Sequence, residues 1–302
     1  MEFLSLILLI VVSLVLPGVI CRVRARLSGR KGASFFQHLY NLRVMLSKSV
    51  VYSYSSSYIT RIVPVVSLAL SFGVLLFVPF GDFKAVLGFD GDIVLFAYLL
   101  ALSRFLMIIA AMDSGSSFQG MGSAREAFYG ALLEPAIFII GGTLALISGN
   151  ISFSTVFSSM GSLSVEFVLV MVLVAYLFIK ILTVETGRIP FDDTLTHLEL
   201  TMVHEVMILD YSGVDLGFIT LSMWLKMGAL SVLAANSVSA CCAGGWIATL
   251  IFSVLTGVYI GFVESFVAKN KMSRNSTFIM IISSIALVLF VVAYIVLQNI
   301  FV

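Results

Sequence analysis

Charged side chains inside apolar segments are the first residues of this sequence that could do chemistry. Long apolar runs are interrupted at Arg104, Glu134, Lys180, Lys226 and Glu264. An ionisable group near the centre of a bilayer costs on the order of 2.5–3.5 kcal/mol, so it persists where it pairs or lines a wet path. A carboxylate in such surroundings can titrate near neutral pH, which favours proton transfer as the role of Glu134.

Each of these residues also has a purely structural interpretation. Arg104 and Glu134 could form a buried ion pair. Lys180, Lys226 and Glu264 stand near the ends of apolar runs, so they could extend their charged groups to the membrane interface. Sequence alone leaves both interpretations open.

Glu126 precedes Glu134 by eight positions. In a helix this spacing is about 12 Å along the axis and nearly the same face. Arg125 and Glu126 stand at the predicted cytoplasmic start of this apolar run, so Glu126 is a candidate proton source for Glu134. Arg104, in the preceding run, is the predicted partner that keeps Glu134 ionised.

The densest group of charges is the segment 185–213, ETGRIPFDDTLTHLELTMVHEVMILDYSG. Its charges are interleaved with leucine, methionine, valine and isoleucine, which predicts a packed interface with another subunit. An H-E-x-x-H zinc motif would need histidine at position 208, where Ile208 stands, so no metal site is predicted. The candidate residues of this segment are Glu185, Arg188, Asp192, Asp193, His197, Glu199, His204, Glu205, Asp210 and Tyr211.

The elements that must position these residues follow from composition. Of the 302 residues, 60% are hydrophobic and only 11% are charged, far from the balance of a soluble domain. Eight continuous apolar runs are long enough to span a bilayer as helices, and they do not alternate as barrel strands would. We therefore predict one all-α transmembrane bundle over residues 1–302, with spans near 3–20, 62–80, 92–112, 126–148, 164–184, 219–240, 245–267 and 277–299.

The distribution of basic residues predicts the orientation of the bundle. Most of the 17 lysines and arginines lie in alternate loops, whereas the opposite side holds Lys84. By the positive-inside rule, both termini lie outside a plasma (inner) membrane. Apolar residues at helical spacing between Phe35 and Leu46 predict an amphipathic helix along the cytoplasmic surface. The predicted cytoplasmic loops are 21–61, 113–125, 185–218 and 268–276.

Charge and cysteine content exclude two classes of partner or site. The net charge of +1 argues against nucleic acid. Cys21, Cys241 and Cys242 form no C-x-x-C pair, so no iron–sulfur cluster or zinc ion is expected on this chain.

The segment 185–213 also carries a family resemblance. ETGRIPFD at 185–192, with Glu199-Leu200 downstream and DYSG at 210–213, resembles the E-T-x-R-x-P-F-D to E-Y-S-G loop of the H subunit of complex I. DDTLTHLELTMVHE at 192–205 resembles more closely the homologous subunit of membrane-bound nickel–iron hydrogenases of the formate hydrogenlyase and hydrogenase-4 type. The blocks at 113–126 and 134–135 are similar to D-T-G-S, G-x-S-R-E and E-P of the same group.

The resemblance implies a membrane subunit without redox centres of its own. Such a subunit anchors a peripheral arm bearing iron–sulfur clusters, with nickel–iron possible in a hydrogenase-like partner, and it couples electron transfer to movement of H⁺ or Na⁺. Antiporter-like membrane subunits and the lipid bilayer are further expected partners. The implied ion-relay residues are Glu126, Glu134, Glu185, Asp192, Asp193, Glu199, Glu205, Lys180 and Glu264. Arg104, Arg125 and Arg188 are expected to tune them, and His197, His204, Asp210 and Tyr211 to face partner subunits.

Departures from the complex I pattern favour the hydrogenase-like branch. Leu195 and His197 stand where complex I carries the first two glutamates of a triplet, and Glu199 remains. These changes fall where complex I builds its quinone chamber, so a quinone-reducing subunit is the second choice. A stand-alone ion transporter and a purely structural anchor also stay open.

Overall fold

A computed structural model describes residues 2–160, 165–193, 199–240 and 245–301 of the chain. Within these ranges the regular secondary structure is helical. Eight of the described helices are long and apolar enough to cross a membrane. They are α1 (Glu2–Leu27), α3 (Tyr58–Leu76), α4 (Asp92–Asp113), α5 (Ser117–Ser148), α7 (Val165–Glu185), α9 (Gly213–Ser239), α10 (Gly245–Phe266) and α11 (Met272–Phe301). The predicted all-α bundle with eight spans is confirmed.

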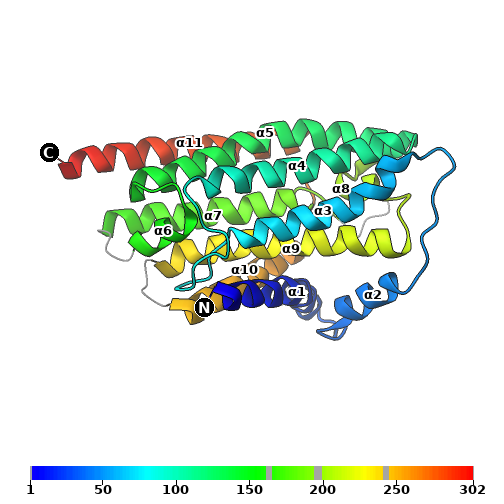
Figure 1. The fold of residues 1–302 in the computed structure, drawn as a ribbon, viewed down its shortest axis with the longest axis horizontal. Coiled ribbons are helices and arrows are strands. Elements are labelled where there is room, and N and C mark those ends of the chain that lie inside the picture. The colour runs from blue at the N-terminus through cyan, green and yellow to red at the C-terminus, as the bar shows by residue number, and fades with distance from the viewer. Residues whose placement is uncertain (1, 161–164, 194–198, 241–244, 302) are drawn as a thin grey trace.

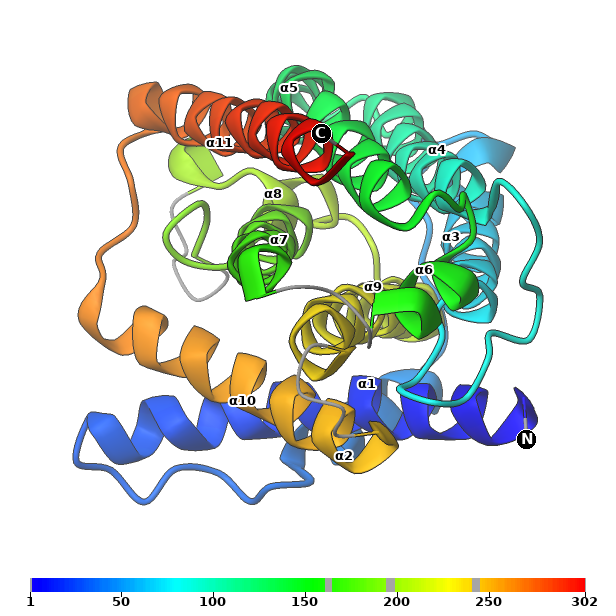
Figure 2. The same cartoon turned by 90° about the vertical axis from the view of Figure 1, so that its left-hand side faces the viewer.

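Most of the long helices run along one axis (Figure 1), whereas α1 and α10 lie across them in the end-on view (Figure 2). Seen end-on, α9 lies inside the bundle, and α5 lies at its edge between α4 and α11 (Figure 2). The most apolar window of α9 is 78% buried, the largest share of any described span. Small residues make this possible: a side chain at Gly228 would overlap Ser13, so glycine lets α1 approach α9 closely.

Four short helices lie at the ends of the bundle. Near one end are α2 (Gln37–Leu46), which packs on α9, the 3₁₀ helix η2 (Glu199–Thr201) and α8 (His204–Met207), which packs on α5. The helix α6 (Phe153–Ser159) lies at the other end (Figure 1). The predicted amphipathic helix is thus α2, although it buries Leu42 while Phe36 and Leu46 stay exposed.

The largest differences from the predicted bounds are in α1, α5 and α9. The arginines at positions 22, 24 and 26 belong to α1, and α9 begins at Gly213 rather than at position 219. α5 begins at Ser117 rather than at position 126, so most of the expected loop 113–125 is helix. Gly122 in this segment has a packing reason, because a side chain there would overlap Val206 of α8.

Candidate functional site

A buried arginine gathers three carboxylates among the described residues. Arg104 of α4 is only 5% exposed. Its Nε lies 3.4 Å from Oε1 of Glu126, its Nη1 lies 3.5 Å from Oε1 of Glu134, and its Nη2 contacts Oε2 of Glu185. Glu126 and Glu134 come from α5, and Glu185 ends α7. The ion pairs of Arg104 therefore link α4, α5 and α7.

The spacing along α5 explains how one arginine reaches two glutamates. Glu126, Gly130 and Glu134 follow one another at four-residue intervals, so they share one face of the helix. A Cβ at Gly130 would lie 2.8 Å from both Cδ and Nη1 of Arg104. The absence of a side chain at position 130 is what admits the guanidinium between the two carboxylates.

Two more residues extend this group. Lys226 of α9 is buried, and its Nζ lies 3.6 Å from Oε1 of Glu185. His204 of α8 places Nδ1 3.4 Å from Oε2 of Glu126. We use the name Arg104 cluster for the set Arg104, Glu126, Glu134, Glu185, His204 and Lys226.

The charge of the Arg104 cluster depends on one proton. Three carboxylates face Arg104 and Lys226, so these five side chains carry a net −1 when all are ionised, and protonated His204 brings the cluster to zero. Burial opposes the charged imidazolium of His204, but the negative charge of Glu126 outweighs burial, so the pKa of His204 is raised. The protonation state of His204 therefore sets the net charge of the cluster.

Asp192 positions His204 rather than joining the cluster. Its buried carboxylate accepts hydrogen bonds from the backbone amides of Val203 and His204, at 2.9 and 3.1 Å. Lys269 donates to the other oxygen at 2.7 Å and to the carbonyl of Thr201 at 2.6 Å. These bonds hold the start of α8 against the loop that follows α7.

Glu264 forms a separate ion pair. Its carboxylate is buried, with Arg188 Nη1 at 3.2 Å and Arg24 Nη1 at 3.8 Å. The contact ties α1, α10 and the segment after α7 together. Extension of Glu264 to the membrane interface, one of the two sequence interpretations, is therefore wrong.

Glu205 lines a cavity of about 250 Å³ beside the Arg104 cluster. Thr186, Arg188, Trp224 and Met223 contribute to the same wall. Burial raises the pKa of Glu205, although the nearby His204 charge acts in the opposite direction. Glu205, a residue of α8, is therefore easier to protonate than an exposed glutamate.

The other predicted site residues lie apart from the cluster. Lys180 contacts the hydroxyl of Tyr259 at 3.5 Å and lies over the ring of Tyr176. Arg125 donates to the carbonyl of Met202 at 2.9 Å, which holds α5 to the segment before α8.

Within the segment 185–213, the backbone amide of Asp193 donates to the Asp192 side chain, and Asp210 is exposed. Tyr211 is buried among apolar residues that include Val63 and Ile219. The backbone of Glu199 begins η2, and His197 falls outside the described residues.

Sequence reasoning did not single out Lys269. For Lys226 it left two interpretations open, and the interfacial one is wrong because Lys226 is buried and α9 is enclosed by α1, α3, α7 and α10. The sequence does contain an indication that Lys226 is buried. The segment GALSVLAANS, which begins two residues after Lys226, is rich in small residues, as is typical of a span with helices on all sides.

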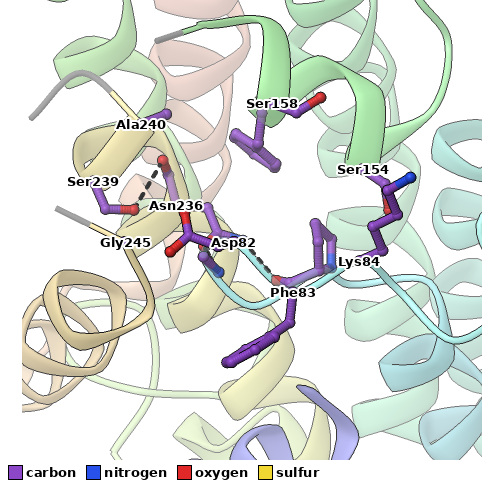
Figure 3. A pocket seen from close by; sticks show the side chains of 12 residues that line it. Asp82, Phe83, Lys84, Ser154, Ser158, Asn236, Ser239, Ala240 and Gly245 are labelled. Carbon is purple, nitrogen blue, oxygen red and sulfur yellow. Dashed lines mark hydrogen bonds between the residues drawn. The ribbon is translucent and has the colours of Figure 1, made fainter. Parts of the chain in front are cut away.

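A larger cavity of about 370 Å³ lies at the opposite end, between the loop after α3, α6 and the end of α9. Figure 3 shows Asp82, Lys84, Asn236 and Ser239 around it. Asn236 donates to the carbonyl of Pro79 at 2.7 Å and accepts from the amide of Gly81 at 3.1 Å. This asparagine therefore fastens the loop to α9.

Comparison with known proteins finds similar chains among the subunits of hydrogenase-4, formate hydrogenlyase and NADH-quinone oxidoreductase. Hydrogenase-4 component C of Escherichia coli (strain K12) is 27% identical over 283 residues, which cover 89% of this chain and 86% of that protein. Formate hydrogenlyase subunit 4 of the same organism is 26% identical over 274 residues, covering 88% and 87%. The H subunit of the NADH-quinone oxidoreductase of Ruthia magnifica subsp. Calyptogena magnifica is 23% identical over 221 residues, covering 72% and 59%.

Solved structures show the same fold. A chain of the membrane-bound sulfane sulfur reductase, an archaeal respiratory membrane complex, matches with a TM-score of 0.74 at 19% identity, covering 96% of this chain and 99% of that one. The sequence profile described as NADH dehydrogenase matches residues 1–301. The chain therefore belongs to the NADH dehydrogenase family, and its predicted resemblance to the H subunit of complex I and to the hydrogenase-linked relatives of that protein is confirmed.

Proposed function

We propose that this chain is the membrane subunit of a complex I-like respiratory complex of the hydrogenase-4 and formate hydrogenlyase type. It anchors a peripheral arm that carries iron–sulfur clusters, with nickel–iron in a hydrogenase-like subunit, and it contacts antiporter-like membrane subunits. Electrons stay in those partners. The chain uses their energy to move H⁺ or Na⁺ across a plasma membrane, with both of its own termini outside.

The observation that carries the proposal is the Arg104 cluster. A single guanidinium is shared by Glu126, Glu134 and Glu185, so a stronger contact with one carboxylate weakens its contact with the others. A carboxylate that loses its cation in a low-dielectric site gains affinity for a proton. Movement of Arg104 between partners is therefore coupled to proton uptake and release.

The neighbouring segment 185–213 supplies the link to the peripheral arm in this proposal. It contributes Glu185 and His204 directly, and Asp192 fixes His204 through backbone hydrogen bonds. A shift of this segment on electron transfer would change the distance between His204 and Glu126. The proton held by His204 would then pass toward Glu126, with Glu134 as the last carboxylate of the path.

Purification of the whole complex through a tag on this chain tests the proposal. We expect iron–sulfur subunits and further membrane subunits to co-purify, and electron transfer from the donor to build an ion gradient in proteoliposomes. The chain alone should then be inactive. Ion transport by the isolated chain would instead establish a stand-alone transporter.

A further inference from the structure

The outward face of α5 differs from the outward faces of the other spans. Its exposed positions in the middle of the helix include Ala124, Ala127, Ala131 and Pro135, spaced by three or four residues. Other spans expose large side chains at mid-helix, for example Leu102 and Phe105 of α4, Leu169 of α7 and Leu287 of α11. Phe128, which is 54% exposed, lies between Ala127 and Ala131, and Phe138 follows the row.

Glu134 lies beside this row, three residues after Ala131. Its side chain is 40% exposed, whereas Arg104 and the other two carboxylates of the cluster are almost fully buried. Its Oε1 meets Arg104, and the remainder of the carboxyl faces outward near the middle of a 32-residue helix. A charged group facing lipid there costs on the order of 2.5–3.5 kcal/mol.

We propose that a transmembrane helix of a different membrane subunit packs on the outward face of α5 and presents a hydrogen-bond donor or a cation to Glu134. A row of small residues lets two helix backbones approach closely. The donor would satisfy the part of the carboxyl that Arg104 leaves free. The proposal rests on the proposed function in treating Glu134 as the end of the ion path.

A second copy of this chain is a poor occupant of the same face. A two-fold interface brings identical patches together, so it would set one Glu134 near the Glu134 of the other copy. Two facing carboxylates in an apolar layer repel each other unless one takes up a proton. A helix with a donor or cation at that depth has the complementary charge.

Photo-crosslinking in the intact complex tests the proposal. A small aliphatic diazirine amino acid is placed at position 127 or 131. The control places it at Leu287, which is 54% exposed in the middle of the neighbouring helix α11. We expect a light-dependent protein adduct at 127 and 131 that is absent at 287, and mass spectrometry should identify an integral membrane subunit. Lipid adducts alone, a dimer of this chain, or a water-soluble partner would each overturn the proposal.

A bulky substitution on the outward face of α5 gives an independent test of the proposed interface. Ala131→Trp should release the neighbouring membrane subunit on native gels, while Leu287→Trp should leave the complex at its full mass. Full-mass complexes from both variants would overturn the proposal.

These assays separate the interface from the relay. An adduct at 131 together with unchanged ion movement by Glu134→Gln would keep the interface and reject the relay role. Lipid adducts alone, together with impaired ion movement by Glu134→Gln, would keep the relay role and reject the interface.

Discussion

Gly130→Ala is the substitution that disturbs the Arg104 cluster without changing a charge. The new methyl group would lie 2.8 Å from Cδ and Nη1 of Arg104, well inside van der Waals contact. A long arginine usually yields at small cost, but each nitrogen of this guanidinium faces a carboxylate. Displacement of Arg104 therefore lengthens at least one of these contacts.

The expected energies can be set against each other. Overpacking a tight site costs about 1–3 kcal/mol, while replacing glycine by alanine inside a helix gains about 0.5–1 kcal/mol. We predict a net destabilisation of about 0–2.5 kcal/mol on this balance. The larger effect should fall on function, because the contacts of Arg104 are the proposed path.

Gly142→Ala on the same helix is the matched control. Its new methyl group would meet Phe290 at 3.7 Å, an ordinary contact, so only the helix-propensity gain applies. The assay is the ion-to-electron ratio of each purified complex in proteoliposomes, beside its thermal stability. We expect Gly130→Ala to lower the ratio and Gly142→Ala to leave it unchanged. Equal ratios for the two variants would refute the role assigned to the Arg104 contacts.

Three further predictions concern the residues around Arg104. Lys226→Met leaves Glu185 with Arg104 as its remaining cation, and loss of one partner of a buried pair costs about 3–5 kcal/mol, so thermal melting of the complex should fall clearly below that of Lys226→Arg. The stability that protonated His204 contributes is complete below its ordinary pKa of 6.5 and is lost as pH rises through the raised pKa. The melting temperature of the unmodified complex should therefore fall as pH rises above 6.5, and that of His204→Gln should depend less on pH over the same range. Asp192→Ala removes the acceptor of the Val203 and His204 amides, so limited proteolysis should cut near α8 faster than in Asp193→Ala, and equal rates would reject the positioning role.

Much of the fold was predictable because eight continuous apolar runs have few folding options in a bilayer. The bounds of α5 were not, since Gly120, Gly122 and the neighbouring serines have loop-like composition. In the structure Gly122 is helical, and its missing side chain makes room for Val206. Composition cannot distinguish a glycine that ends a helix from one that lets another element approach.

The site was predictable only in part. The intramembrane positions of Arg104 and Glu134 pointed to each other, and the structure places them in contact. Glu185 and Lys226 stand far apart in sequence, and their meeting depends on how α7 packs against α9. Gly130 carried no charge and no motif, so its role became visible only from the space that Arg104 occupies.

The central claim is that Glu134 belongs to an ion path driven by electron transfer elsewhere in the complex. Glu134→Gln keeps the shape and hydrogen-bonding capacity of the side chain but cannot carry the charge or the proton. The most direct test is the ion-to-electron ratio of the purified Glu134→Gln complex in proteoliposomes. We predict normal assembly and measurable electron transfer with a lowered ratio, whereas a ratio equal to that of the unmodified complex would contradict the account.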